Sequence, residues 1–459
     1  MSKQSFFLIL IAISLLGLVL RVVDYDRVPA FGETRDEFMY PWAGMSLLLT
    51  GVPSSWSYFD SYTNYKSIYL WDQEFRIVTP WFDKPLLYPI MTGSVMLVTG
   101  ATQFGDIQIS ILRLLPLAFS FISIILLGIF ARHTFGPPVG ILTALLYATT
   151  PQIVIANRLS LTENLFIPLS LGVLVLLLSV PKPGTKRLLC IGLLSGLGFL
   201  TKQIGVSLFT AVAVYFIWRR QWRNLLITSI PFALSVLVHL AVAYMYDFKL
   251  YLSVMSDFRH GHTLAGLPEL VMTIFRYPGI SEKTRPFLDS TMLLGFILLF
   301  ASPFFLFTKE RDKNDQVIPF LLFPFTYLAF LVLLESGATP YSFFGWHVFP
   351  LYPFIATLVA YILYRTWRET NLFQLLILIL VLGSSSVRFF LMFFPREVQH
   401  RWQYLLTAAV VIALIAYIRP LQKYKKVYLI VLLGIFISVH IYTVINLGAL
   451  IGSSPQPRG

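Results

Sequence analysis

Long apolar runs alternate with short polar connections over most of the chain. After a first run at residues 5–20 comes a polar and aromatic stretch at residues 24–112. Runs of about 17–25 residues have the length that an α-helix needs to cross a bilayer. Further runs follow near residues 113–131, 138–156, 162–180, 188–201, 203–218, 225–245, 288–308, 317–335, 346–364, 371–391, 402–418 and 427–446. With the first, they predict about thirteen transmembrane helices.

Composition supports a membrane protein. Hydrophobic residues make up 57% of the chain, charged residues only 12%, and the mean hydropathy is +0.74. A soluble domain carries about 25% charged residues. The runs are continuous, which favours helices over the alternating strands of a barrel. We therefore expect an all-α, polytopic membrane protein.

The net charge of +13 comes largely from cations in short connections between spans, where they report topology, so no nucleic-acid partner is expected. Cys190 is the single cysteine, which excludes a disulfide framework. Residues 5–20 resemble a signal-peptide core, but Arg21 follows without a small-residue cleavage pattern. A retained first span is expected.

The orientation depends on residues 86–100 (LLYPIMTGSVMLVTG), which form either a short span or a helix on the membrane surface. If they lie on the surface and the N-terminus is cytoplasmic, most Lys- and Arg-rich short connections are cytoplasmic too. The positive-inside rule favours this arrangement. The long loops at residues 24–112 and 246–287 are then exterior, and amphipathic surface helices are expected in the first.

Acidic residues concentrate in the first exterior loop. Of the 22 Asp and Glu residues, ten lie there: Asp24, Asp26, Glu33, Asp36, Glu37, Asp60, Asp72, Glu74, Asp83 and Asp106. Asp36 and Glu37 open an amphipathic segment at residues 36–51. Acids are common in the first turn of a helix. A carboxylate partly desolvated near the membrane surface also has a raised pKa and serves as a base.

Two other places combine an acid with a cation. Asp83-Lys84-Pro85 reads as a helix start with proline in its first turn, or as a carboxylate and an ammonium at the level of lipid phosphates. Arg158 and Glu163 lie between two spans. They are interpreted either as a snorkelling arginine paired with an acid or as a functional pair.

Lys202 and the segment DFRHGHT add further candidates. Lys202 lies at the tip of a helical hairpin on the exterior side, as a membrane anchor or a site cation. In the segment, His260 and His262 flank a glycine beside Asp257, a spacing that suits either solvated side chains or a metal.

The order of these motifs resembles that of the GT-C glycosyltransferases. It is most similar to the protein O-mannosyltransferase and aminoarabinose transferase group (family 39). The matching elements are Asp36-Glu37 with Tyr40, Asp83-Lys84-Pro85-Leu86, Arg113, Arg158 with Glu163, the segment from Gly196 to Lys202, and residues 346–353. The resemblance covers residues 1–365 as a catalytic transmembrane module. Residues 366–450 would be further helices, and residues 451–459 a disordered tail.

The resemblance implies roles for individual residues. Asp36 would be the catalytic base, with Glu37 and Tyr40 in the acceptor site. The donor phosphate would be bound by Lys84, Arg158 and Lys202. Asp83 and Glu163 would be cavity acids, and His260 and His262 candidate ligands for a divalent metal, the only cofactor suggested.

The implied activity is inverting transfer of a sugar from a polyprenyl-phosphate donor. The acceptor would be a hydroxyl of a protein, glycolipid or glycan on the exterior side of the membrane. A transporter or flippase of lipid-linked sugars is the main alternative. It predicts acids buried in the middle of spans, whereas most acids in this chain lie in loops. Ligase-like enzymes and assembly subunits are further alternatives.

Overall fold

The structure is a computed structural model. It describes residues 2–179, 183–260, 289–309, 314–335, 345–395, 397, 402–415, 417–451 and 453, and the architecture is that of these residues. The α-helices are α1 (Lys3–Val22), α2 (Asp36–Thr50), α3 (Leu87–Val98), α4 (Ile109–Leu112), α5 (Leu114–Phe135), α6 (Pro137–Thr149), α7 (Pro151–Ala156), α8 (Thr162–Leu178), α9 (Thr185–Thr201), α10 (Val206–Trp218), α11 (Trp222–Tyr246), α12 (Phe248–His260), α14 (Ser290–Lys309), α15 (Asn314–Glu335), α16 (Tyr352–Arg368), α17 (Leu372–Leu391), α19 (Trp402–Ile415), α20 (Lys425–Ile445) and α21 (Leu447–Ile451). Strands β1 (Ser55–Trp56), β2 (Lys66–Leu70) and β3 (Gln73–Val78) form one small sheet.

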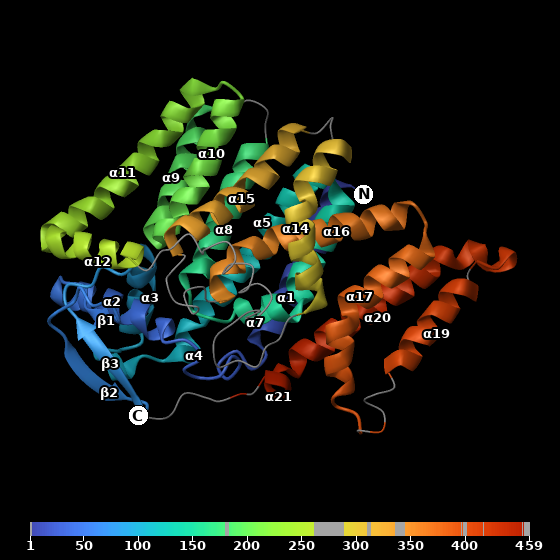
Figure 1. Cartoon of the computed structure of the whole chain (residues 1–459), viewed down its shortest axis with the longest axis horizontal. Helices are drawn as coiled ribbons and strands as arrows, with labels where there is room; N and C mark the ends of the chain where they lie inside the picture. The colour runs from blue at the N-terminus through green and yellow to red at the C-terminus, as the bar shows by residue number, and fades with distance from the viewer. Residues whose placement is uncertain are drawn as a thin grey trace.

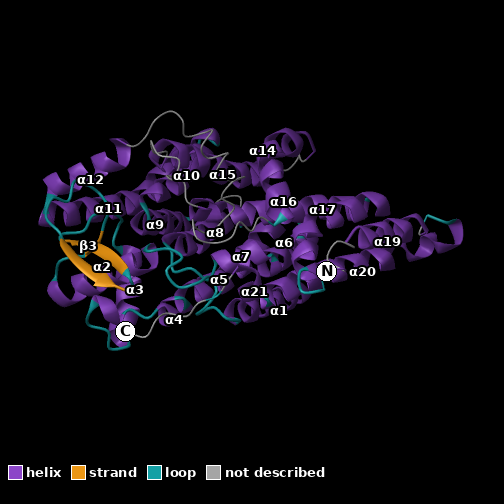
Figure 2. Cartoon of the chain, turned by 60° about the horizontal axis from the view of Figure 1, so that its bottom comes forward, coloured by secondary structure: helices purple, strands orange, loops and turns teal. Residues whose placement is uncertain are grey.

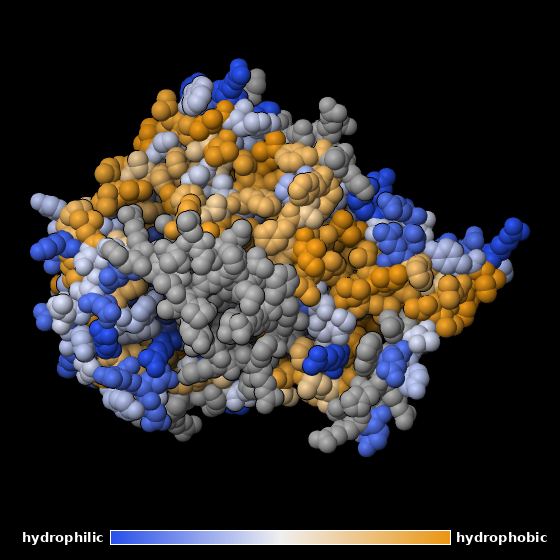
Figure 3. Space-filling view, in the orientation of Figure 1, coloured by the Kyte–Doolittle hydropathy of each residue, from blue (hydrophilic) through white to orange (hydrophobic). Residues whose placement is uncertain are grey.

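The helical part has the apolar exterior of a membrane protein. Among the described residues, eight helices are long and apolar enough to cross a bilayer, and four apolar helices are shorter. Helix α11 carries Leu226, Leu234 and Leu237 outward with more than half of each side chain exposed. Hydrophobic residues cover much of the visible helical surface, whereas hydrophilic ones gather over the sheet at lower left (Figure 3). The prediction of an all-α polytopic membrane protein is confirmed, while the count of thirteen stays a prediction.

Short breaks between helices follow the sequence closely. Helix α5 ends at Phe135 and is followed by Gly136, whose φ of +100° is accessible to glycine, and Pro137 begins α6. Helix α9 ends at Thr201, and Lys202 is extended before a short 3₁₀ turn and α10. Helix α8 packs between α5 and α9, and α16 packs on α6 (Figure 1).

The long loop after α1 contains helices α2 and α3 and the sheet. Helices α2 and α3 cross closely, and the sheet has the order β1-β3-β2 with antiparallel pairing (Figure 2). Trp71 and Asp72, both with positive φ, form the two-residue turn between β2 and β3. Two helices in this loop were expected from the sequence; the sheet was not.

Aromatic side chains form the core beneath this sheet. The ring of Trp71 lies 4.7 Å from that of Phe38, and Phe75 packs against Phe104 at 5.1 Å. Because Phe38 lies in the first turn of α2, the hairpin holds the N-terminal end of that helix. The sheet therefore supports the place where Asp36 and Glu37 stand.

The last helices lie beside the rest of the bundle. Helices α17 and α20 pack together and extend to the right in Figure 1. A buried polar cluster connects them to the start of α14, where Ser386 donates to Asp289 Oδ2 at 2.9 Å. His440 Nε2 lies 3.9 Å from the same carboxylate oxygen.

Candidate active site

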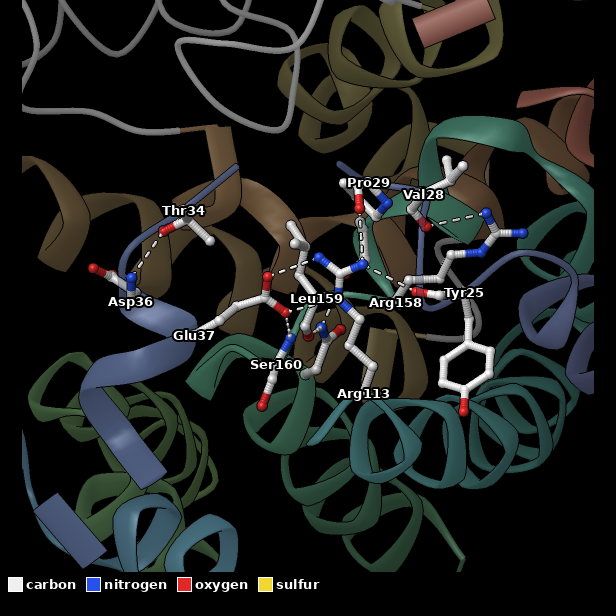
Figure 4. A network of polar contacts seen from close by, with 12 residues as sticks. Tyr25, Val28, Pro29, Thr34, Asp36, Glu37, Arg113, Arg158, Leu159 and Ser160 are labelled. Carbon is white, nitrogen blue, oxygen red and sulfur yellow. Dashed lines mark hydrogen bonds and ion pairs between the residues drawn. The ribbon is translucent and has the colours of Figure 1, made fainter. Parts of the chain in front are cut away.

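A buried ion pair lies beside the first residue of α2 (Figure 4). Arg113, at the junction of α4 and α5, binds Glu37 through two hydrogen bonds of 3.0 and 2.8 Å. The same guanidinium donates to the carbonyl oxygens of Tyr25 and Pro29 at 3.0 and 2.8 Å. Glu37 Oε1 also accepts from the main-chain N–H of Ser160 at 2.9 Å. Paired arginine and carboxylate forks fix geometry as well as charge.

Asp36 stands next to this pair with a different exposure. Glu37 is only 1% exposed, whereas Asp36, at the first position of α2, is half-buried. The main-chain N–H of Asp36 donates to Thr34 Oγ1 at 3.2 Å. In Figure 4 the Asp36 carboxylate points away from Arg113. The two adjacent acids thus differ: Glu37 is locked inside the protein, and Asp36 is accessible.

Tyr40 connects Asp36 with Glu163. It lies one helical turn after Asp36, is buried and packs edge-to-face on Tyr88 with ring centroids 5.3 Å apart. Burial raises the pKa of the Tyr40 phenol, and the charges of Asp36 and Glu163 raise it further. Tyr88 in turn shares a 2.9 Å hydrogen bond with Ser160. Helices α2, α3 and α8 therefore meet at these two tyrosines.

Glu163 and Lys202 form a second buried ion pair. Lys202 Nζ donates to Glu163 Oε1 at 2.9 Å, and Thr162 Oγ1 donates to Oε2 at 3.0 Å. The side chains of Lys202 and Glu163 are 4% and 2% exposed. The extended backbone at Lys202, between α9 and the following 3₁₀ turn, directs its side chain toward the start of α8.

Asp83 is buried beside the same site. The Tyr62 hydroxyl donates to Asp83 Oδ1 at 2.9 Å, and Gln203 Nε2 donates to the main-chain oxygen of Asp83 at 3.1 Å. Burial raises the pKa of the Asp83 carboxyl to about 7; its hydrogen bonds and Lys84 oppose the shift, and the charge of Asp36 adds to it. Lys84 follows with a half-buried side chain.

Arg158 lies apart from this group. Its guanidinium donates to the carbonyl oxygens of Leu20 and Val28 at 2.9 and 3.3 Å. In Figure 4 it lies on the opposite side of the Glu37–Arg113 pair from Asp36. Arg158 therefore supports the end of α1. The residues that come together are Asp36, Tyr40, Asp83, Glu163 and Lys202.

The candidate metal ligands fall at the edge of the described chain. His262 lies outside the described residues, and so does the side chain of His260, whose backbone ends α12. Over the described ranges, no three His, Cys, Asp or Glu side chains form a group able to hold a metal ion. The metal therefore stays a prediction.

Two residues beside the site have partners that the sequence did not predict. Tyr62, in the stretch SYTNY, carries no motif, and only the fold brings it to Asp83. Arg113 is one of the elements that carry the resemblance, but its partner Glu37 is 76 positions away in the sequence. A buried arginine at a span end needs an acid or carbonyls, and that requirement was the available signal.

Comparison with known proteins gives one family match. Residues 83–246 match the family described as dolichyl-phosphate-mannose-protein mannosyltransferase. No curated protein matches the chain. Among solved structures, ArnT from Cupriavidus metallidurans bound to undecaprenyl phosphate is similar, with a TM-score of 0.50 and 15% identity. That match covers 98% of this chain and 79% of the other.

Two archaeal structures share the fold as well. The Archaeoglobus fulgidus oligosaccharyltransferase tethered with an acceptor peptide has a TM-score of 0.56, 12% identity and 99% coverage of this chain. AglB from the same organism, in complex with an inhibitory peptide and a dolichol-phosphate, gives a TM-score of 0.53, 11% identity and 99% coverage. The chain spans 56% and 57% of the chains in those two structures. Because the sequence identities are only 11–15%, the structural similarity establishes a shared fold alone.

Proposed function

We propose that this membrane protein is a glycosyltransferase of the GT-C superfamily, which its motifs resemble, and that it is an inverting enzyme using a polyprenyl-phosphate sugar donor. The acceptor is a hydroxyl group on the exterior side of the membrane. The family match at residues 83–246 and the shared fold support the class of reaction.

One observation carries the proposal: an accessible carboxylate stands where acids and cations from distant segments meet. Asp36 neighbours Tyr40 and Asp83, while Glu163 and Lys202 reach the same place from α8 and the end of α9. Glu37 is held by Arg113 and Ser160, which leaves Asp36 as the accessible acid of the pair. This difference supports Asp36 as the catalytic base and Glu37 as a neighbour held in a fixed position.

The reaction follows from these positions. Asp36 accepts the proton of the acceptor hydroxyl while its oxygen forms a bond to the anomeric carbon. The bond from that carbon to the phosphate oxygen breaks on the opposite face, so the configuration inverts and the lipid phosphate leaves as an anion. Lys84 and Lys202 stabilise its charge. Preorganised charges in a partly dry site act more strongly than the same charges in water.

Replacing the base provides the test. We expect Asp36→Asn to lower sugar transfer from a polyprenyl-phosphate donor at least about 100-fold, the usual scale for loss of a general base. Asp26→Asn is the matched control, because Asp26 lies in the same loop with a 42% exposed side chain. Unchanged turnover by a folded Asp36→Asn enzyme would reject the assignment. The assay measures labelled sugar on an extracted acceptor in membranes.

A further inference from the structure

Helix α12 docks on the first exterior loop through polar contacts. Asp257 Oδ2 accepts the main-chain N–H of Ser61 at 2.8 Å, and the hydroxyls of Ser253 and Ser61 lie 2.9 Å apart. The ring of Tyr251 packs edge-on against Phe82 with centroids 5.8 Å apart. Both views place α12 at the end of α11, on the side of the molecule that holds the sheet and α2 (Figures 1 and 2).

The segment that receives α12 also holds the acid of the candidate site. Tyr62, next to Ser61, donates to Asp83 Oδ1 and accepts the main-chain N–H of Phe82 at 2.8 Å. Phe82, which α12 contacts through Tyr251, directly precedes Asp83. Two short paths therefore lead from α12 to Asp83, one through Ser61 and Tyr62, the other through Phe82.

Helix α12 has anchors of its own at its start. Asp247 Oδ1 accepts the main-chain N–H of Leu250 at 2.9 Å and caps the first turn. Tyr251 shares a 3.3 Å hydrogen bond with His239 of α11. Tyr246, at the end of α11, donates to the carbonyl oxygen of Gly51. The helix is thus fixed at both α11 and the first loop, so it can hold a neighbour in place.

We propose that α12 is a positioning element for the Asp83–Lys84 pair, and that its docked arrangement is the working state of the enzyme. Asp257 and Ser253 hold Ser61, Tyr62 then fixes the Asp83 carboxyl, and Lys84 is carried with it toward the donor phosphate. This inference rests on the proposed function, and it assigns to the second exterior loop a role in donor binding.

A disulfide tests the docking directly. In a Cys190→Ser background, which removes the single cysteine, Ser61→Cys and Ser253→Cys place two thiols where hydroxyls lie 2.9 Å apart. We expect mild oxidation to form the disulfide, detected by a gel-mobility change, and sugar transfer to be at least as fast as in the reduced protein. Failure to cross-link would refute the docking. Cross-linking that abolishes transfer, with recovery on reduction, would refute the docked state as the working one.

Substitution of Asp257 tests the positioning role. Asp257→Ala removes the acceptor for the Ser61 N–H, so we expect the KM for the lipid-linked donor to rise about five-fold or more, with a smaller change in kcat. Asp257→Asn retains an oxygen acceptor and should restore the KM. Lys249→Ala, exposed on the same helix, is the control. An unchanged KM in Asp257→Ala would refute the role.

The two tests separate this inference from the proposed function. If the native protein transfers no sugar from any lipid-phosphate donor, the proposed function fails, whereas the disulfide still reports whether α12 docks. If the native protein is active and the Asp257 variants differ only in folded yield, the proposed function stands and the positioning role fails.

Discussion

Asp83 shows how the environment of one side chain changes its chemistry. Burial is the main cause of its raised pKa of about 7, and Tyr62 and Lys84 oppose that shift. Near pH 7 the Asp83 carboxyl is therefore present in both forms. The protonated form can donate a hydrogen bond, and the ionised form can only accept one. An ordinary aspartate titrates near a pKa of about 3.9.

The raised pKa predicts a pH dependence of stability. Burial raises the pKa of the Asp83 carboxyl from 3.8, the ordinary value that it regains in the unfolded chain, to about 7 in the folded protein. The folded state binds more protons between these values, so this group lowers stability as pH rises through that window. We expect Asp83→Asn, which is neutral throughout, to show a smaller fall in melting temperature across that window than the native protein. Parallel curves for the two proteins in detergent would contradict this account.

Lys202 offers a second prediction at the residue scale. Lys202→Met should raise the KM for the lipid-linked donor about ten-fold, the equivalent of about 1.4 kcal/mol. Because this change leaves Glu163 buried without its cation, the double variant Lys202→Met/Glu163→Gln separates donor binding from folding. We expect the double variant to regain melting temperature but not donor affinity. If the double variant binds the donor with normal affinity, Lys202 only neutralises Glu163 and does not bind the donor.

Two helices of the first loop depend on glycine for their close crossing. A Cβ on Gly44 of α2 would lie 1.8 Å from the carbonyl oxygen of Pro89 in α3. A Cβ on Gly93 would lie 2.4 Å from the main-chain nitrogen of Met45. Backbone atoms cannot yield as a side chain can, so the helices would have to separate. Because α2 begins with Asp36, this crossing positions the proposed base.

Gly44→Ala should therefore affect both stability and activity. Overpacking typically costs about 1–3 kcal/mol, and we expect a lower melting temperature together with slower sugar transfer. Gly184→Ala is the matched control, because a Cβ there meets nothing within 4 Å and its φ is −74°. Equal melting temperatures for the two variants would show that α2 and α3 can separate at little cost.

The Glu37–Arg113 pair joins distant parts of the whole molecule. It links α2, the start of α5, the loop after α1 and the main chain at Ser160, all within hydrogen-bonding distance. Buried charges need such complete pairing, because removing one partner leaves the other desolvated. The pair thus fixes the position of the long loop after α1 relative to the bundle.

Arg113→Met should destabilise the fold strongly. Breaking a buried ion pair costs about 3–5 kcal/mol, whereas an exposed pair contributes at most about 1 kcal/mol. Arg27→Met removes such an exposed contact, 3.8 Å from Asp26, and serves as the control. Thermal unfolding in detergent measures both. Comparable losses in the two variants would mean that Arg113 is not structurally decisive.

The amino-acid sequence by itself determined the class of fold and supplied the candidate residues of the site, whose roles stay predictions. Continuous apolar runs can be satisfied only by helices in a membrane, so the architecture followed from hydropathy. Glu163 was a candidate because a charge at a span end is costly to place, whereas Asp36, Asp83 and Lys202 were candidates from their place in the loops and from the order of the motifs.

Tertiary structure alone decided which of these residues meet. It turned Arg158 toward carbonyls of α1 and the loop after it, locked Glu37 on Arg113, brought Tyr62 to Asp83, and placed α12 against Ser61. Such pairings depend on contacts between segments far apart in the chain, as for Ser61 and Asp257, which are 196 positions apart. The sequence around either residue of such a pair does not reveal its partner, because the two residues meet only when the whole chain folds.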